Sequence, residues 1–242
     1  MHSSLASPGV LKEPEPSVTA VAPVWHTVSV LLLLGAIGAL SLRMSMMNPA
    51  AQGKHRALGY LVSMAAEWLI VGFIAFKAPL RTLVGSFAPT WRSVLRDLGI
   101  AIAYLLAAQV ILGTISAVLS RFLPSQANAV LKNMVPHTAL EIALYLLLSL
   151  TAGICEEIMF RGYLQRQFAA WTGNAIAAIL LQGIVFGLAH GYQGLSMVIV
   201  IAVFGCMFGW LAWWRKSLRP GMMAHFLQDG VGGIVLARFL PK

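Results

Sequence analysis

Long runs of apolar residues, separated by short polar connections, dominate the sequence from residue 24 onwards. A helix needs about 20 mainly apolar residues to cross the hydrocarbon core of a bilayer. By this criterion the pattern predicts about seven membrane-spanning helices, or as many as eight. The seven lie at residues 24–42, 57–77, 94–120, 138–160, 175–191, 194–214 and 221–239. The fourth is expected to continue as a helix to about residue 168, and the Ser- and Pro-rich residues 1–23 predict a disordered tail.

Composition supports the membrane interpretation. The chain has 242 residues, of which 59% are hydrophobic and only 10% charged, whereas about a quarter of the residues in a soluble domain are charged. We therefore expect an all-α, polytopic integral membrane protein. Cys155 and Cys206 both lie in apolar segments and are expected to be small buried side chains rather than a disulfide or a metal pair.

The formal net charge of +9 is explained by the connections between the spans. Lys and Arg gather in segments 77–97, 161–174 and 215–219, and the positive-inside rule assigns this side to the cytoplasm. The N-terminus is then cytoplasmic as well, although the basic residues between 43 and 56 would lie outside. Basic residues next to spans also meet anionic lipid headgroups. No basic patch with interleaved aromatic residues occurs, so we expect no nucleic-acid partner.

The stretch AGICEEIMFRGYLQ, at residues 152–165, places charged residues at the end of an apolar run. On a helix Glu157 and Arg161 are four residues apart and share a face, so they are expected to form an ion pair. Glu156 is turned about 100° away and has no partner within this motif. A free buried carboxylate suits a general base, but two glutamates can also simply mark an interfacial helix end.

Two further motifs place polar residues inside spans. FGLAH, at residues 186–190, puts Phe186 and His190 one helical turn apart, so the ring is expected to pack on the imidazole. HFLQD puts His225 and Asp229 on one face, as a metal-ligand pair, a catalytic pair or a plain hydrogen bond. Either motif alone equally fits a structural polar contact within the membrane.

The predicted topology brings these motifs together. The fourth and fifth spans form an antiparallel hairpin with its turn near Gly173, which sets Glu156 and His190 at similar depth. The last span enters from the same side, with His225 and Asp229 near its start. One carboxylate, two histidines and an acid are therefore expected to meet below the cytoplasmic surface, where they can activate a water molecule.

EEIMFR, FGLAH and HFLQD, in this order, resemble the EExxxR, FxxxH and HxxxN/D motifs of the CPBP family. This family contains the type II CAAX prenyl endopeptidases and the bacterial Abi-type bacteriocin-processing and immunity proteins. The resemblance covers roughly residues 140–236. It implies that N-terminal membrane helices at 24–137 precede a catalytic core at 138–240, and that the protein is an intramembrane endopeptidase.

The resemblance also implies roles for the motif residues. Glu156 and His190 would activate the attacking water, and His225 and Asp229 would stabilise the oxyanion of the tetrahedral intermediate. The residues implied to support the site structurally are Glu157, Arg161 and Phe186. No HExxH, GxSG or GxGD motif of other intramembrane proteases occurs in the sequence.

Metal use stays open in the sequence. Glu156, His190 and His225 would make a zinc set with an open position, and a metal-free glutamate mechanism is the competing account. Position 229 is Asp where the family more often has Asn, and an ionised Asp cannot donate a hydrogen bond to an oxyanion. Either Asp229 is protonated, or it orients His225, or it helps to hold a metal. The presence of Asp in place of Asn slightly favours the metal interpretation.

The expected substrate is a prenylated (CAAX-type) protein or another hydrophobic membrane-associated peptide, with membrane lipid as the surroundings. The alternative is a non-catalytic, Abi-like immunity or scaffold protein that binds a peptide or partner in the same pocket. A transporter is disfavoured, because the polar groups cluster in one half of the chain without pseudo-symmetric broken helices. The bacterial inner membrane is the expected location.

Overall fold

The computed structural model describes residues 19–47, 55–85, 89–123 and 134–239. These residues form helices and connections, without a strand, which confirms the all-α prediction. Most of the predicted tail lies outside the described residues. The helices are α1 (Val24–Met47), α3 (Arg56–Lys77), α4 (Leu80–Val84), α5 (Trp91–Leu119), α7 (Ala139–Glu156), α8 (Gln165–Thr172), α9 (Ala175–Ala189), α10 (Leu195–Arg215), α11 (Arg219–Phe226) and α12 (Gly232–Phe239).

The described residues also form three helical segments that are not α-helical: the π-helical segments Glu157–Leu164 and Leu227–Val231, and a 3-10 turn at Gly191–Gln193. The first π-helical segment joins α7 to α8 without a break, as the sequence predicted for the fourth span. The second joins α11 to α12. In a π-helix the hydrogen-bonded turn contains an extra residue, and such turns often occur at functional sites.

Five described helical stretches are long and apolar enough to cross a membrane, so the protein is an integral membrane protein, but the predicted seven or eight spans are not confirmed. The stretches are Val24–Ser45, Arg56–Lys77, Trp91–Leu119, Ala139–Thr172 and Leu195–Arg215. The predicted fifth span is α9, whose 15 residues rise only about 22 Å, against about 30 Å of hydrocarbon. The predicted last span is divided into α11, a π-helical segment and α12.

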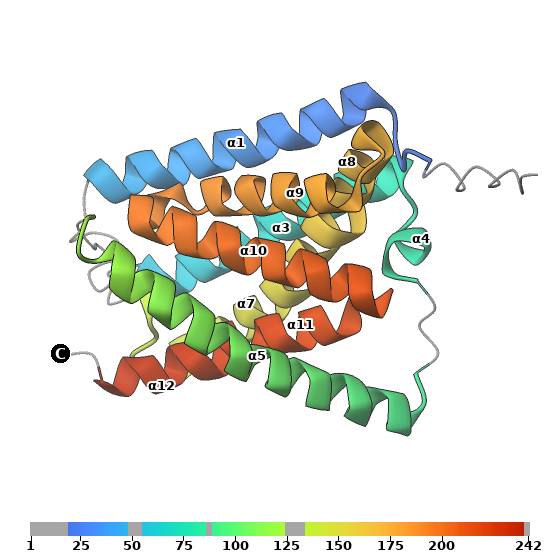
Figure 1. Cartoon of the computed structure of the whole chain (residues 1–242). Helices are drawn as coiled ribbons and strands as arrows, with labels where there is room; N and C mark the ends of the chain where they lie inside the picture. The colour runs from blue at the N-terminus through green and yellow to red at the C-terminus, as the bar shows by residue number, and fades with distance from the viewer. Residues whose placement is uncertain (1–18, 48–54, 86–88, 124–133, 240–242) are drawn as a thin grey trace, which may run out of the picture.

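The helices form one bundle, with α1 along one flank and α5 crossing the other (Figure 1). Between them α9 packs on α10, α3 packs on α7, and α11 contacts both α5 and α7. The α9–α10 contact is close because glycine lines it. A Cβ added to Gly183 would lie 2.9 Å from the carbonyl oxygen of Ala202. Small residues of this kind are typical of helix contacts inside membranes.

A tight turn joins α8 to α9. Gly173 ends α8 in the left-handed conformation, with φ of +63°, and Asn174 begins α9 by accepting hydrogen bonds from the backbone N–H groups of Ile176 and Ala177. Glycine adopts this conformation without the steric cost of a Cβ. The predicted hairpin with its turn near Gly173 is therefore confirmed.

Hydrogen bonds join helix α1 to α3 and to the first π-helical segment. The Nε2 of His26 lies 3.1 Å from the carbonyl oxygen of Phe73 and its Nδ1 lies 2.7 Å from the hydroxyl of Tyr163. Since a carbonyl only accepts, His26 carries its proton on Nε2 and accepts the Tyr163 proton on Nδ1. Thr27 also contacts this hydroxyl, at 2.9 Å. These contacts orient the segment that carries Arg161.

Candidate active site

The predicted ion pair of Glu157 and Arg161 forms at the centre of the bundle. Its Oε1–Nη1 distance is 3.0 Å, and neither side chain is exposed. Arg161 also donates from Nη2 to the carbonyl oxygen of Gly205, at 3.2 Å. Its guanidinium lies 4.5 Å from the ring centroid of Phe186 and 5.0 Å from that of Phe208. These contacts offset the cost of burying the charge.

Helix α11 approaches this ion pair at a glycine. A Cβ added to Gly221 would lie 2.7 Å from Oε2 of Glu157, so only glycine leaves room for the carboxylate. One turn later His225 faces the same carboxylate, with 3.4 Å between its Nδ1 and Oε1 of Glu157. The close approach of α11 therefore joins the third sequence motif to the first.

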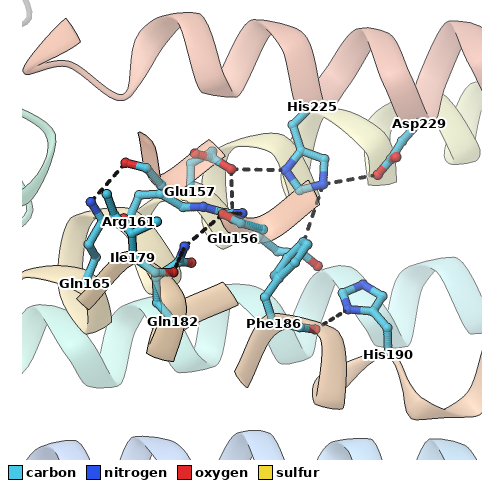
Figure 2. Close-up of polar contacts among 12 residues, drawn as sticks. Glu156, Glu157, Arg161, Gln165, Ile179, Gln182, Phe186, His190, His225 and Asp229 are labelled. Atoms are coloured by element: carbon cyan, nitrogen blue, oxygen red, sulfur yellow. Dashed lines mark hydrogen bonds and ion pairs between the residues drawn. The ribbon is translucent and has the colours of Figure 1, made fainter. Parts of the chain in front are cut away.

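The other imidazole nitrogen of His225 faces two more carboxylates (Figure 2). Its Nε2 lies 3.5 Å from Oε2 of Glu156 and 3.4 Å from Oδ2 of Asp229. The predicted shared face of His225 and Asp229 is therefore confirmed. Glu156, which has no partner in its own motif, faces this imidazole across the helix contact. With carboxylates at both nitrogens, His225 can carry a proton on each.

His190 lies at the end of α9, on the other side of Phe186 from His225 (Figure 2). The Phe186 ring centroid is 4.8 Å from that of His190 and 6.1 Å from that of His225. This confirms the predicted packing of Phe186 on His190. The Nδ1 of His190 donates to the carbonyl oxygen of Phe186 at 2.8 Å, which leaves Nε2 with its lone pair available as an acceptor.

The four candidate catalytic side chains thus come from three helical stretches. Glu156, His225 and Asp229 are in direct contact, and His190 joins them through the ring of Phe186. Glu156 is 15% exposed and Asp229 40%, so the cluster is accessible from one side, whereas the Glu157–Arg161 pair is sealed.

An apolar groove of about 740 Å³ lies between α3, α4, α7 and α11, close to this cluster in sequence. Ile154 and Ile158 flank the two glutamates, and Met222 precedes His225 by one turn. The full lining consists of Trp68, Leu80, Arg81, Thr82, Val84, Gly85, Ile154, Ile158 and Met222. The groove can take an apolar ligand, and Arg81 is the charged group in its wall.

Zinc binding needs a set of ligands held around one point. Glu156 and His225 are 3.5 Å apart, but His190 is separated from His225 by Phe186. Among the described residues no three His, Cys, Asp or Glu side chains are grouped so that they can hold a metal ion. The zinc set of Glu156, His190 and His225 therefore stays a prediction. Both cysteines are free thiols.

The sequence interpretation missed Glu67. It lies near the middle of α3 and within electrostatic range of Glu156, His225 and Asp229. Its Oε2 is closed off from solvent and has no hydrogen-bond partner in the described part of the chain. A lone carboxylate at the centre of an apolar span is a signal of function that the sequence already contained.

Residues 138–231 match the model of the family described as type II CAAX prenyl endopeptidase Rce1-like. All three motifs lie within this segment, whereas Glu67 lies outside it. The fold and site define a helical membrane protein with a Glu, His and Asp cluster that is accessible from one side. The match of this segment supports membership of the CPBP family, which its motifs predicted. No curated protein and no solved structure matched the chain.

Proposed function

We propose that this protein is an intramembrane endopeptidase that hydrolyses prenylated (CAAX-type) or other hydrophobic membrane-associated peptides. The observation that carries the proposal is the contact of Glu156 with His225, 3.5 Å apart, inside the segment that matches the endopeptidase family. The family implies a protease. The cluster supplies a proton acceptor and proton donors below the membrane surface, which peptide hydrolysis requires.

In this proposal Glu156 is the general base. It takes a proton from water as the oxygen attacks the peptide carbonyl, and it later gives this proton to the leaving amine. His190 supports it as a second acceptor, because the Nδ1 contact with Phe186 leaves Nε2 free to accept from the same water. A single water is proposed to lie between these two acceptors.

His225 is assigned to the oxyanion of the tetrahedral intermediate. Glu157 and Asp229 hold its ring from opposite sides, and the Nε2 proton, on the side of the partly exposed Glu156 and Asp229, is the proposed donor. A fixed donor stabilises developing charge without reorganisation. Asp229 is proposed to orient His225, since their contact is 3.4 Å and an ionised carboxylate cannot itself donate. Glu157 and Arg161 are proposed to be structural supports.

The apolar groove favours a hydrophobic substrate. Its walls include Ile154, Ile158 and Met222, which lie within three residues of Glu156 or His225 in the sequence, so the groove and the cluster are built by the same helices. The proposed partners are therefore a peptide or prenylated protein and the surrounding lipid. The second candidate is an Abi-like immunity or scaffold protein that binds in the same groove without turnover. The observation that favours it is the sealed ion pair of Glu157 and Arg161, which joins helices and is explained without any chemistry.

Turnover distinguishes the two candidates. Purified protein in lipid vesicles is incubated with a prenylated peptide and with its unprenylated counterpart, and the products are identified by mass spectrometry. In parallel, membrane peptides are compared between cells with wild-type protein and cells with Glu156→Ala. New C-termini that require Glu156 support the endopeptidase, whereas bound but uncleaved peptide in both assays supports the scaffold.

A second proposal is that the protein binds zinc, with Glu156, His190 and His225 as its ligands. A zinc-dependent protein is expected to lose cleavage after exhaustive chelation and to regain it when Zn²⁺ is added back. Metal content is measured in the same samples. Full cleavage by protein without bound metal would remove zinc and leave the metal-free mechanism.

Glu67→Met is expected to make the protein more stable and less active. The change removes a carboxyl whose Oε2 is buried without a partner, and such a group costs about 1–3 kcal/mol. It also removes a titratable carboxyl within range of Glu156 and His225, so kcat/KM is expected to fall by roughly tenfold or more. Thermal unfolding and cleavage rates are measured on the same preparation.

Glu141→Gln is the matched control for this prediction. Glu141 lies in the capping box at the start of α7, where its side chain accepts from the backbone N–H of Thr138. Its replacement is expected to leave kcat/KM unchanged. A Glu67→Met protein that is less stable than wild type, or fully active, would show that Glu67 has a purely structural role.

A further inference from the structure

A second apolar groove, of about 620 Å³, lies between α5 and α10, and none of the residues that line it belongs to the catalytic cluster. On α10 it is lined by Val203, Met207, Trp210 and Trp214, and on α5 by Ile100, Tyr104, Ala107 and Ile111, among others. Each set covers eleven residue steps, which is about 16 Å of helix. That length is roughly half of the ~30 Å hydrocarbon core, or the depth of one leaflet.

Arginine side chains surround one end of this groove. Trp214 lines the groove, and the guanidinium of Arg215 lies 5.2 Å from its ring centroid. Arg215 and Arg96 both face Asp97, with nitrogen–oxygen distances of 3.8 and 3.5 Å. Asp97 is buried, and its closest contact is Arg219, at 2.6 Å. Helices α5, α10 and α11 therefore meet at this cluster of charges.

The charges in this cluster do not cancel. Arg219 takes the shortest contact with the single carboxylate of Asp97, so Arg96 and Arg215 are left with positive charge that their long contacts neutralise only in part. The Nε of Arg215 is also closed off from solvent and has no hydrogen-bond partner within the described residues. Two cations with spare donors are complementary to a phosphate.

The neighbouring aromatic residues place this cluster at the membrane surface. Trp210 and Trp214 stack with a centroid distance of 5.5 Å, and both are about half exposed. Exposed tryptophans at the end of a span are typical of the headgroup level. The cationic end of the groove is thus at headgroup depth, and its apolar length runs from there toward the middle of the bilayer.

We propose that the α5–α10 groove binds an anionic glycerophospholipid, with its phosphate on Arg96 and Arg215 and one acyl chain along the groove. The groove is about as long as one leaflet is deep, its lining is apolar, and its positive charge lies at one end. These three features favour a lipid over a free phosphate, which would need no groove. A peptide would need polar partners along its backbone, and the groove between Ile111 and Trp210 offers few. The site lies apart from Glu156 and is independent of the proposed peptidase activity.

Lipid retention tests the proposal. Wild-type protein is reconstituted in nanodiscs of equimolar phosphatidylglycerol and phosphatidylcholine, released into mild detergent, and analysed by native mass spectrometry. We expect phosphatidylglycerol to remain bound in preference by tenfold or more. Each basic residue near an anionic headgroup contributes about 1 kcal/mol, or roughly fivefold. Arg96→Gln is therefore expected to lower the preference about fivefold, and Arg96→Gln/Arg215→Gln to remove it.

Two further variants test the acyl-chain contact and the specificity of the arginine effect. Ala107→Trp fills the groove and leaves the arginines in place, so it is expected to lower retention of both lipids. Lys77→Gln, a basic residue at the end of α3 that lies outside the cluster, is expected to behave as wild type. Because Arg96 is largely exposed, Arg96→Gln tests the headgroup contact without disturbing the fold. Equal retention of the two lipids by wild type, or unchanged retention in Ala107→Trp, would overturn the proposal.

Discussion

Glu156→Gln protein is expected to fold as wild type does, to bind a hydrophobic peptide with unchanged affinity, and to cleave it about 10²–10⁴-fold more slowly. Glutamine keeps the size of the side chain and its contact with His225, but it cannot accept the proton of the attacking water. The loss is therefore expected in kcat, with peptide binding unchanged. Single-turnover cleavage in vesicles, with binding measured separately, gives both quantities.

His190→Ala extends this test to the second proposed acceptor. It is expected to leave a folded protein with a similar loss in kcat, because the water would keep only one of its two acceptors. Groups that act on the same water are not additive, so the double variant is expected to be little worse than either single one. Wild-type cleavage of the true substrate by both Glu156→Ala and His190→Ala would show the endopeptidase proposal to be wrong.

Arg161→Met is expected to cost about 3–5 kcal/mol in the free energy of unfolding, since it leaves Glu157 buried beside only one remaining partner. The ion pair is 3.0 Å long with no exposure on either side, so water cannot replace the lost guanidinium. The apolar partners Phe186 and Phe208 accept a methionine in its place. Equilibrium unfolding in mixed detergent micelles measures the change.

The double variant Glu157→Met/Arg161→Met is expected to recover much of this loss, because a matched pair of apolar residues leaves no unpaired charge. Arg166→Met is the matched control, five residues further along the same helical stretch. Arg166 is exposed and donates to the carbonyl oxygen of Thr82, so its loss is expected to cost less than about 1 kcal/mol. Equal losses of unfolding free energy in Arg161→Met and Arg166→Met would mean that the buried ion pair stabilises the protein no more than an exposed hydrogen bond does.

Contacts within one helix could be predicted from the sequence, and contacts between helices mostly could not. The pairs Glu157–Arg161, Phe186–His190 and His225–Asp229 follow from four-residue spacing, which is fixed by helix geometry. The contact of His225 with Glu156 depends on how α11 sits against α7. This placement is set by the close approach at Gly221, which spacing does not encode.

The number of spans was harder to predict for a physical reason. Apolar composition shows that a helix is buried in lipid or protein, but it does not show how far the helix extends. Helix α9 is apolar throughout, yet it stops after 15 residues at the turn that begins with Gly191.

Glu67 was missed for a different reason. Its span carries no motif, and its relation to Glu156 appears only once α3 is packed on α7.

The hydroxyl of Tyr163 shows how much of the chain is needed for one stable unit. It lies two residues from Arg161, inside the matched segment, but its buried partners His26 and Thr27 belong to α1, far outside that segment. In a bilayer no water would replace them. Residues 138–231 without α1 are therefore expected to leave this hydroxyl unpaired inside the bundle. The segment that matches the family and the set of helices that completes its buried hydrogen bonds have different boundaries.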